Sequence, residues 1–76
     1  MAMPQDLPIA TPVRYRPGQG TYGYEDALEA GGCLSGVVIG HTATRVRVRV
    51  TFRVGPRTGQ TYERAVDRRS LQHGDA

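Results

Sequence analysis

The sequence predicts an all-β domain of about five short antiparallel strands, and three stretches support this prediction. In residues 45–54, valine or phenylalanine alternates with arginine or threonine, which places apolar and polar side chains on opposite faces of one strand. Residues 55–59, Gly-Pro-Arg-Thr-Gly, end that strand in a turn. Residues 34–40 form an apolar run that contains Gly36 and Gly40. Such alternation is typical of an antiparallel sheet with one buried and one exposed face.

The N-terminal part of the sheet is predicted to be a short strand followed by a long loop. Residues 13–16 alternate between apolar side chains and arginine, which indicates the first strand. Residues 17–33 contain five glycines, a density typical of an irregular loop. Within it, residues 24–30 are compatible with one or two helical turns, closed by Gly31 and docked through Leu28, or with loop.

The C-terminal part completes the sheet. Residues 41–44 are predicted to be a tight connection into the alternating strand. Residues 60–66 indicate a fourth strand, residues 67–69 a single 3₁₀ turn, and residues 70–72 a short closing strand.

The length indicates one small domain with flexible ends. A chain of 76 residues buries only about 60% of its unfolded surface, so its core is thin. Three prolines predict a flexible arm over residues 1–12. The folded domain is expected over residues 13–72, and a disordered tail over residues 73–76.

Cysteine and histidine usage argues against an enzyme. Cys33 is the only cysteine, so no disulfide can form within the chain. His41, His73 and Cys33 lack the spacing of metal ligands, and nothing nearby would orient a nucleophile. We therefore expect no catalytic residue, no metal and no cofactor. Neither a signal peptide nor a run of about 18 apolar residues is visible, so we expect a cytoplasmic protein without a membrane partner.

The charged residues permit an acidic partner. The chain has ten basic and seven acidic residues, for a formal net charge of +3, and every basic residue is an arginine. Arginine is well suited to bidentate contact with phosphate, although a GC-rich genome would produce the same bias.

The alternating strand supplies the first candidate site. Side chains two residues apart on one strand face are about 6.5–7 Å apart, a repeat that suits the phosphates of a nucleic acid. The candidate nucleic-acid-binding residues are Arg14, Arg16, Arg45, Arg47, Arg49, Arg53 and Arg57. The alternative is a solvated strand face, whose arginines pair with Glu63 or with Asp67 and the loop acids.

The long loop supplies the second candidate site. Tyr22, Tyr24, Glu25 and Asp26 together have the composition of a recognition loop. The alternative is that one tyrosine covers the core and the acids solvate the loop. These acids are also candidates to pair with the arginine strand of a second copy, which would give a homo-oligomer.

The predicted order of elements resembles that of SH3-like barrels over residues 13–72. The resemblance depends on residues 36–40 (Gly-Val-Val-Ile-Gly), the alternating strand and residues 66–71. It implies a small barrel of the kind that bacterial mobile elements and phages carry, including integron cassettes. Residues 59–62, Gly-Gln-Thr-Tyr, partly resemble a Val-Gln-Ile-Tyr segment of type II dihydrofolate reductases. That resemblance implies a small oligomeric reductase with Gln60 and Tyr62 lining a pore.

The favoured function is a non-catalytic binding module with nucleic acid as its partner. The first alternative is a protein-interaction or self-assembling module that uses the long loop and an open sheet edge. The second alternative is the small oligomeric reductase.

Overall fold

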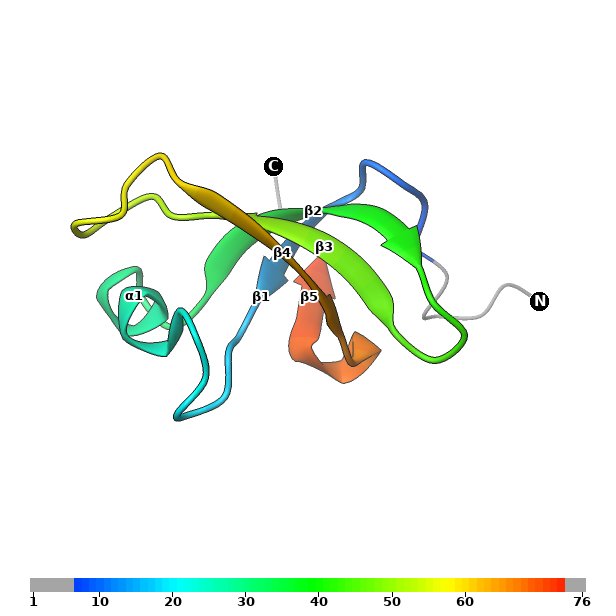
Figure 1. Ribbon diagram of the computed structural model, residues 1–76, viewed down its shortest axis with the longest axis horizontal. Helices are drawn as coiled ribbons and strands as arrows, with labels where there is room; N and C mark the ends of the chain where they lie inside the picture. The colour runs from blue at the N-terminus through cyan, green and yellow to red at the C-terminus, as the bar shows by residue number, and fades with distance from the viewer. Residues whose placement is uncertain (1–6, 74–76) are drawn as a thin grey trace.

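The computed structural model describes residues 7–73, which form one antiparallel sheet and two short helices (Figure 1). The elements in chain order are β1 (Pro12–Tyr15), α1 (Tyr24–Glu29), β2 (Leu34–His41), β3 (Val46–Thr51), β4 (Thr61–Val66), the 3₁₀ helix η1 (Arg68–Ser70) and β5 (Leu71–His73). The strand order is β4-β3-β2-β1-β5. The predicted all-β domain of five antiparallel strands is confirmed, as is the short helix in its first loop. No pairing joins β4 to β5 within the described residues, so the barrel is not closed.

The buried face of the sheet follows from the alternation in β3. Val46, Val48 and Val50 are buried, because every second side chain of the strand points to the same side. The register places Val48 opposite Val38 of β2 and Val50 opposite Tyr62 of β4, so both neighbours contribute to the same core. The other buried apolar residues are Leu7, Val13, Tyr15, Ala27, Leu34, Phe52, Val66 and Leu71.

The third strand is shorter than predicted. It ends at Thr51, although Phe52 stays in the core and is 1% exposed. The Phe52 amide donates to the Gln60 carbonyl at 3.0 Å, and the Phe52 carbonyl accepts from the Gly59 amide at 2.8 Å. The prediction that Val54 shares the buried face is wrong. Val54 is 38% exposed, because the chain has already turned away from the sheet there.

The N-terminal segment packs on the sheet from residue 7 onward. Leu7 is buried, the Ala10 amide donates to the Val38 carbonyl at 2.7 Å, and the Val38 amide donates to the Thr11 carbonyl at 3.0 Å. The described part of the expected arm therefore belongs to the domain, and residues 1–6 lie outside the described residues. At the other end, His73 belongs to β5, and residues 74–76 lie outside them as well.

The long loop is fixed to the core near its centre, at Gly23 and Ala27. The φ of Gly23 is 88°, in the left-handed region that favours glycine. A Cβ at Gly23 would lie 2.9 Å from Tyr62 Oη and 3.2 Å from Leu34 Cδ1, so only glycine allows this close approach. The predicted docking through Leu28 is wrong, because Leu28 is 57% exposed while Ala27 is buried. One residue along a helix turns the side chain by about 100°, away from the sheet.

Gly23→Ala should destabilise the fold by about 2–4 kcal/mol, since it adds a left-handed alanine and a steric clash. Gly20→Ala is the matched control, because Gly20 has φ 85° but open space around its Cβ position. It should cost only about 1–2 kcal/mol. Urea unfolding of both variants measures the difference. Equal losses of stability in the two variants would mean that a Cβ at Gly23 does not clash with the core.

Candidate nucleic-acid interface

The arginines of β3 share one carboxylate on the outer face of the sheet. Arg47 and Arg49 are exposed, and the register places Glu63 of β4 directly opposite Arg49. Arg49 donates to Glu63 Oε2 from Nη2 at 2.9 Å and from Nε at 3.2 Å. Arg47 Nη2 lies 3.9 Å from Glu63 Oε1. The three side chains together carry one positive charge, and such exposed pairs are worth about 0–1 kcal/mol.

Four other predicted arginines are exposed and have no such partner. Arg14 lies on the outer face of β1, and Arg16 follows directly after that strand. Arg45 comes directly before β3 in the sequence, and Arg53 comes two residues after its end. Within residues 7–73, none of the four forms an ion pair with a carboxylate. Their charges are therefore open to an external anion.

Arg57 is not part of this outer surface. Its guanidinium Cζ lies 4.6 Å from the ring centroid of Tyr22 and 5.6 Å from that of Phe52. Arg57 Nη1 lies 3.4 Å from Asp26 Oδ2, and Asp26 is 7% exposed. Arg57 therefore fixes the turn between β3 and β4 against the long loop. Figure 1 shows α1 and this turn at the same end of the sheet.

Arg64 points to the inner side of the sheet. The register places Arg64 opposite Val48, and its Nε is buried with no hydrogen-bond partner among residues 7–73. Tyr62 is likewise paired with a buried valine, Val50, and so shares this inner side. Arg64 therefore adds nothing to the outer surface.

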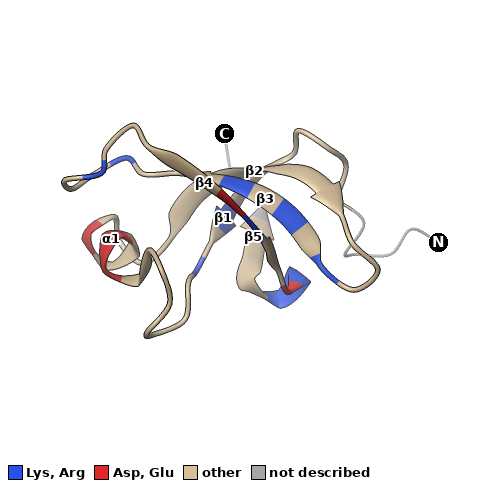
Figure 2. Cartoon of the chain, in the orientation of Figure 1, with Lys and Arg blue, Asp and Glu red and all other residues tan. Residues whose placement is uncertain are grey.

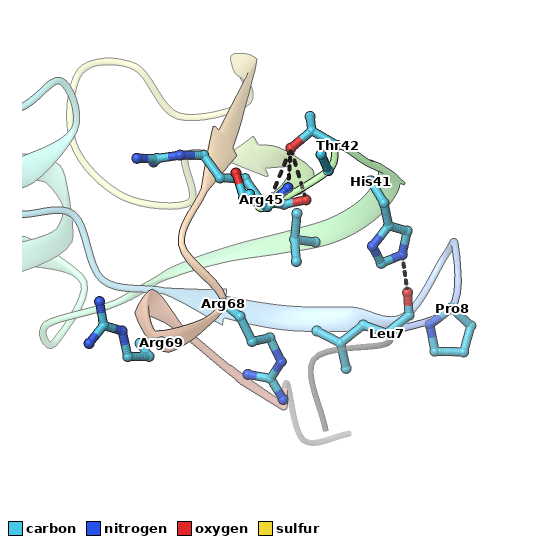
Figure 3. Close-up of a pocket in the computed structure, with 10 residues that line it drawn as sticks. Leu7, Pro8, His41, Thr42, Arg45, Arg68 and Arg69 are labelled. Carbon is cyan, nitrogen blue, oxygen red and sulfur yellow. Dashed lines mark hydrogen bonds between the residues drawn. The ribbon is translucent and has the colours of Figure 1, made fainter. Parts of the chain in front are cut away.

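A broad hollow of about 860 Å³ lies at the opposite end, beside the turn between β2 and β3 (Figure 3). Arg45, Arg68 and Arg69 line it together with His41 and Leu7. His41 Nε2 lies 2.6 Å from the Leu7 carbonyl oxygen, so this ring ties the N-terminal segment to β2.

Two of the three arginines in this hollow have partners inside the chain. Arg69 donates from Nη2 to Asp67 Oδ2 at 3.1 Å and from Nε to Asp67 Oδ1 at 3.3 Å. These side-chain hydrogen bonds, with a further one from the Arg69 amide, lower the pKa of Asp67. Arg68 Nη1 donates to the Leu71 carbonyl at 3.2 Å.

The tyrosines of the candidate surfaces are largely engaged in packing. Tyr22 makes edge contacts with Phe52 and Tyr62, at centroid distances of 5.9 Å and 4.8 Å. Tyr62 stacks on Phe52 at 5.3 Å, and its Oη donates to the Tyr22 carbonyl at 3.4 Å. Gln60, the other residue of the reductase resemblance, is exposed. Of the loop tyrosines, Tyr22 lies with its ring against Phe52 and Tyr62, while 51% of this residue stays exposed.

The acids of the recognition loop lie at one end of the molecule. Tyr22, Tyr24, Glu25, Asp26 and Glu29 line a hollow of about 380 Å³ beside Arg57. Figure 2 shows the acidic positions of α1 apart from the arginine positions of β1 and β3. The contact between Arg57 and Asp26 joins the turn after β3 to helix α1, which are distant in the chain. The sequence allowed the loop acids as partners of arginine but did not indicate this particular pair.

Two further features bear on the class of site. No helix in residues 7–73 has the length and apolar character needed to cross a membrane. In the same part of the chain, no three His, Cys, Asp or Glu side chains gather as a metal site requires.

No protein-family model, curated protein or solved structure matches this chain. Function must therefore be argued from the arrangement of its side chains.

The environment of Tyr62 should make the stability of the fold depend on pH in alkaline solution. Burial, with a smaller effect of nearby Tyr15, raises the pKa of Tyr62 from 10.0 to about 12. The folded state therefore holds this proton more tightly than the unfolded state does. The resulting stability is complete below about pH 10 and is lost as the pH rises toward 12.

Tyr62→Phe keeps the ring stacking and removes the ionisable group, so its stability should fall less steeply over that range. Chemical unfolding of both proteins at several pH values measures this difference. Parallel pH profiles would show that Tyr62 does not titrate differently in the folded and unfolded states.

Proposed function

We propose that this domain is a non-catalytic module that binds nucleic acid through backbone phosphates. The observation that carries the proposal is the set of four exposed arginines without ion pairs, Arg14, Arg16, Arg45 and Arg53, within the described chain. A free guanidinium binds phosphate without first breaking an internal contact. A cytoplasmic location fits this role, because nucleic acid is accessible there and a lone cysteine stays reduced.

Little base readout is expected from this surface. Phosphate contacts fix the position of a nucleic acid but carry no sequence information. Of the residues able to stack on bases, Tyr62 packs against Phe52, and the Tyr22 ring lies against Phe52, Tyr62 and Arg57. The module should therefore bind many sequences with similar affinity.

A salt titration of binding to single-stranded and duplex oligonucleotides tests the proposal. Fluorescence anisotropy at micromolar protein should show an affinity that falls steeply with salt. The slope of log K against log salt is about −0.7 per phosphate contact for single strands and about −0.9 for duplexes, so it counts the contacts. Absence of binding at low salt would refute nucleic-acid binding.

Glu63→Gln should strengthen binding by about two- to fivefold, because it frees Arg47 and Arg49 from a pair worth at most about 1 kcal/mol. Glu25→Gln changes the net charge equally but lies on α1, so it is the matched control. The same oligonucleotide titration compares them. An equal gain in both variants would mean that binding responds to net charge alone and not to the position of the freed arginines.

A self-assembling module is the second candidate, and the separation of charge favours it. The acidic hollow on the α1 side and the arginines of the sheet lie on different parts of one chain, so two copies can complement each other. This candidate predicts a mass that rises with protein concentration and falls with added salt, measured by sedimentation. A monomer at all concentrations in low salt would exclude it.

A further inference from the structure

We propose that the nucleic-acid backbone crosses the sheet over β1, through two adjoining arginine-lined hollows that meet at Arg14, rather than following β3. This inference deepens the proposed function and rests on it. The inferred ligand of the two hollows is a run of consecutive phosphodiester groups.

The first hollow lies between β1 and the end of β3. It has a volume of about 220 Å³, and Arg14 and Arg53 line it together with the hydroxyl-bearing Ser35 and Thr51. The register explains this grouping, because Ser35 is paired with Arg14 on one side and with Thr51 on the other. The two guanidinium groups and the two hydroxyls can donate hydrogen bonds to the oxygens of a phosphate. No carboxylate of the described chain lines this hollow.

The second hollow lies on the other side of Arg14, toward β5. It has a volume of about 230 Å³ and contains no carboxylate among its described lining residues, which are Arg14, Arg16, Cys33, Arg69, Ser70 and Gln72. Gln72 of β5 is paired with Arg14, so the same row of the sheet continues into this hollow. Arg69 is the one arginine here that has an acidic partner, Asp67.

The two hollows adjoin, since Arg14 and Cys33 line both. The polar row runs Gln72, Arg14, Ser35 and Thr51 across four neighbouring strands. In each strand at least one residue next to this row is buried, namely Leu71, Val13, Tyr15, Leu34, Val50 and Phe52, so the row lies on the outer face. Such a row is perpendicular to the strands, and a backbone bound along it would cross β3 instead of following it.

The electrostatics favour this row over the arginines of β3. Arg14, Arg16 and Arg53 have no ion pair within residues 7–73, whereas Arg47 and Arg49 are both held by Glu63. A phosphate that binds along β3 must displace or lie beside that carboxylate. A phosphate that binds at Arg14 meets no carboxylate among the described residues that line the two hollows.

The position of Cys33 allows a direct test. It is the only cysteine of the chain, is half-buried, and lines both hollows. The rate of alkylation by iodoacetamide, an uncharged reagent, is measured by mass spectrometry on the full chain with and without a single-stranded oligothymidylate. With oligonucleotide at about ten times its Kd, about a tenth of the protein is free, so the rate should fall about tenfold.

The two outcomes that oppose the inference are distinguishable. If anisotropy shows binding while the alkylation rate of Cys33 is unchanged, the path over β1 is overturned and the proposed function stands. If anisotropy shows no binding at low salt, the proposed function itself fails. Repeating the experiment with a duplex shows which form of nucleic acid occupies the hollows, and protection by either form supports the path.

A pair of matched variants gives a second test. Arg14→Gln and Arg47→Gln remove the same charge from exposed positions on the same sheet face. Arg14→Gln should weaken binding more, and should reduce the salt slope by about one phosphate contact. Arg47→Gln should have the smaller effect, because Glu63 already offsets its charge. The opposite order of effects would place the path on β3.

Discussion

The burial of alternate side chains in β3 is the constraint on which the rest of the structure depends. Val46, Val48 and Val50 fill a core that is thin, so the strand cannot rotate or slip by one residue without exposing them. The same alternation forces Arg47 and Arg49 outward. Because β3 is hydrogen-bonded to β2 and β4, its register also decides which side chains of those strands face outward. The charge pattern of the surface is therefore a consequence of how the core is packed.

The positions of the charged residues on this surface matter more than the net charge of the chain. A net charge of +3 is modest, yet three of the carboxylates lie on α1 at one end of the molecule. Arg57 is withdrawn from the surface by Asp26 and the ring of Tyr22. What remains on the outer face is a small group of arginines that no carboxylate of the described residues neutralises. Local charge, rather than the formal total, is what a ligand would encounter.

Features that depend on residues close together in the sequence could be predicted. Contacts that depend on how distant segments are paired could not. Period-two alternation and glycine-rich turns predicted the strands, and five of them formed. Leu28 was expected to dock α1 because it is the most apolar residue there, but the start of the helix directs Ala27 inward instead. The pairing of Arg57 with Asp26, and the placement of Arg14 and Cys33 beside the same hollows, join distant parts of the chain. No local pattern indicates such contacts.

The open barrel leaves β4 and β5 as the edges of the sheet in the described chain. An edge strand exposes backbone donors and acceptors on which another chain can add a strand, and this is a route to aggregation. On β4 the adjacent residues Glu63 and Arg64 carry opposite charges and point to opposite faces. An incoming strand would have to match a charge on each face at the same place. These two charges on the edge strand therefore oppose unwanted growth of the sheet.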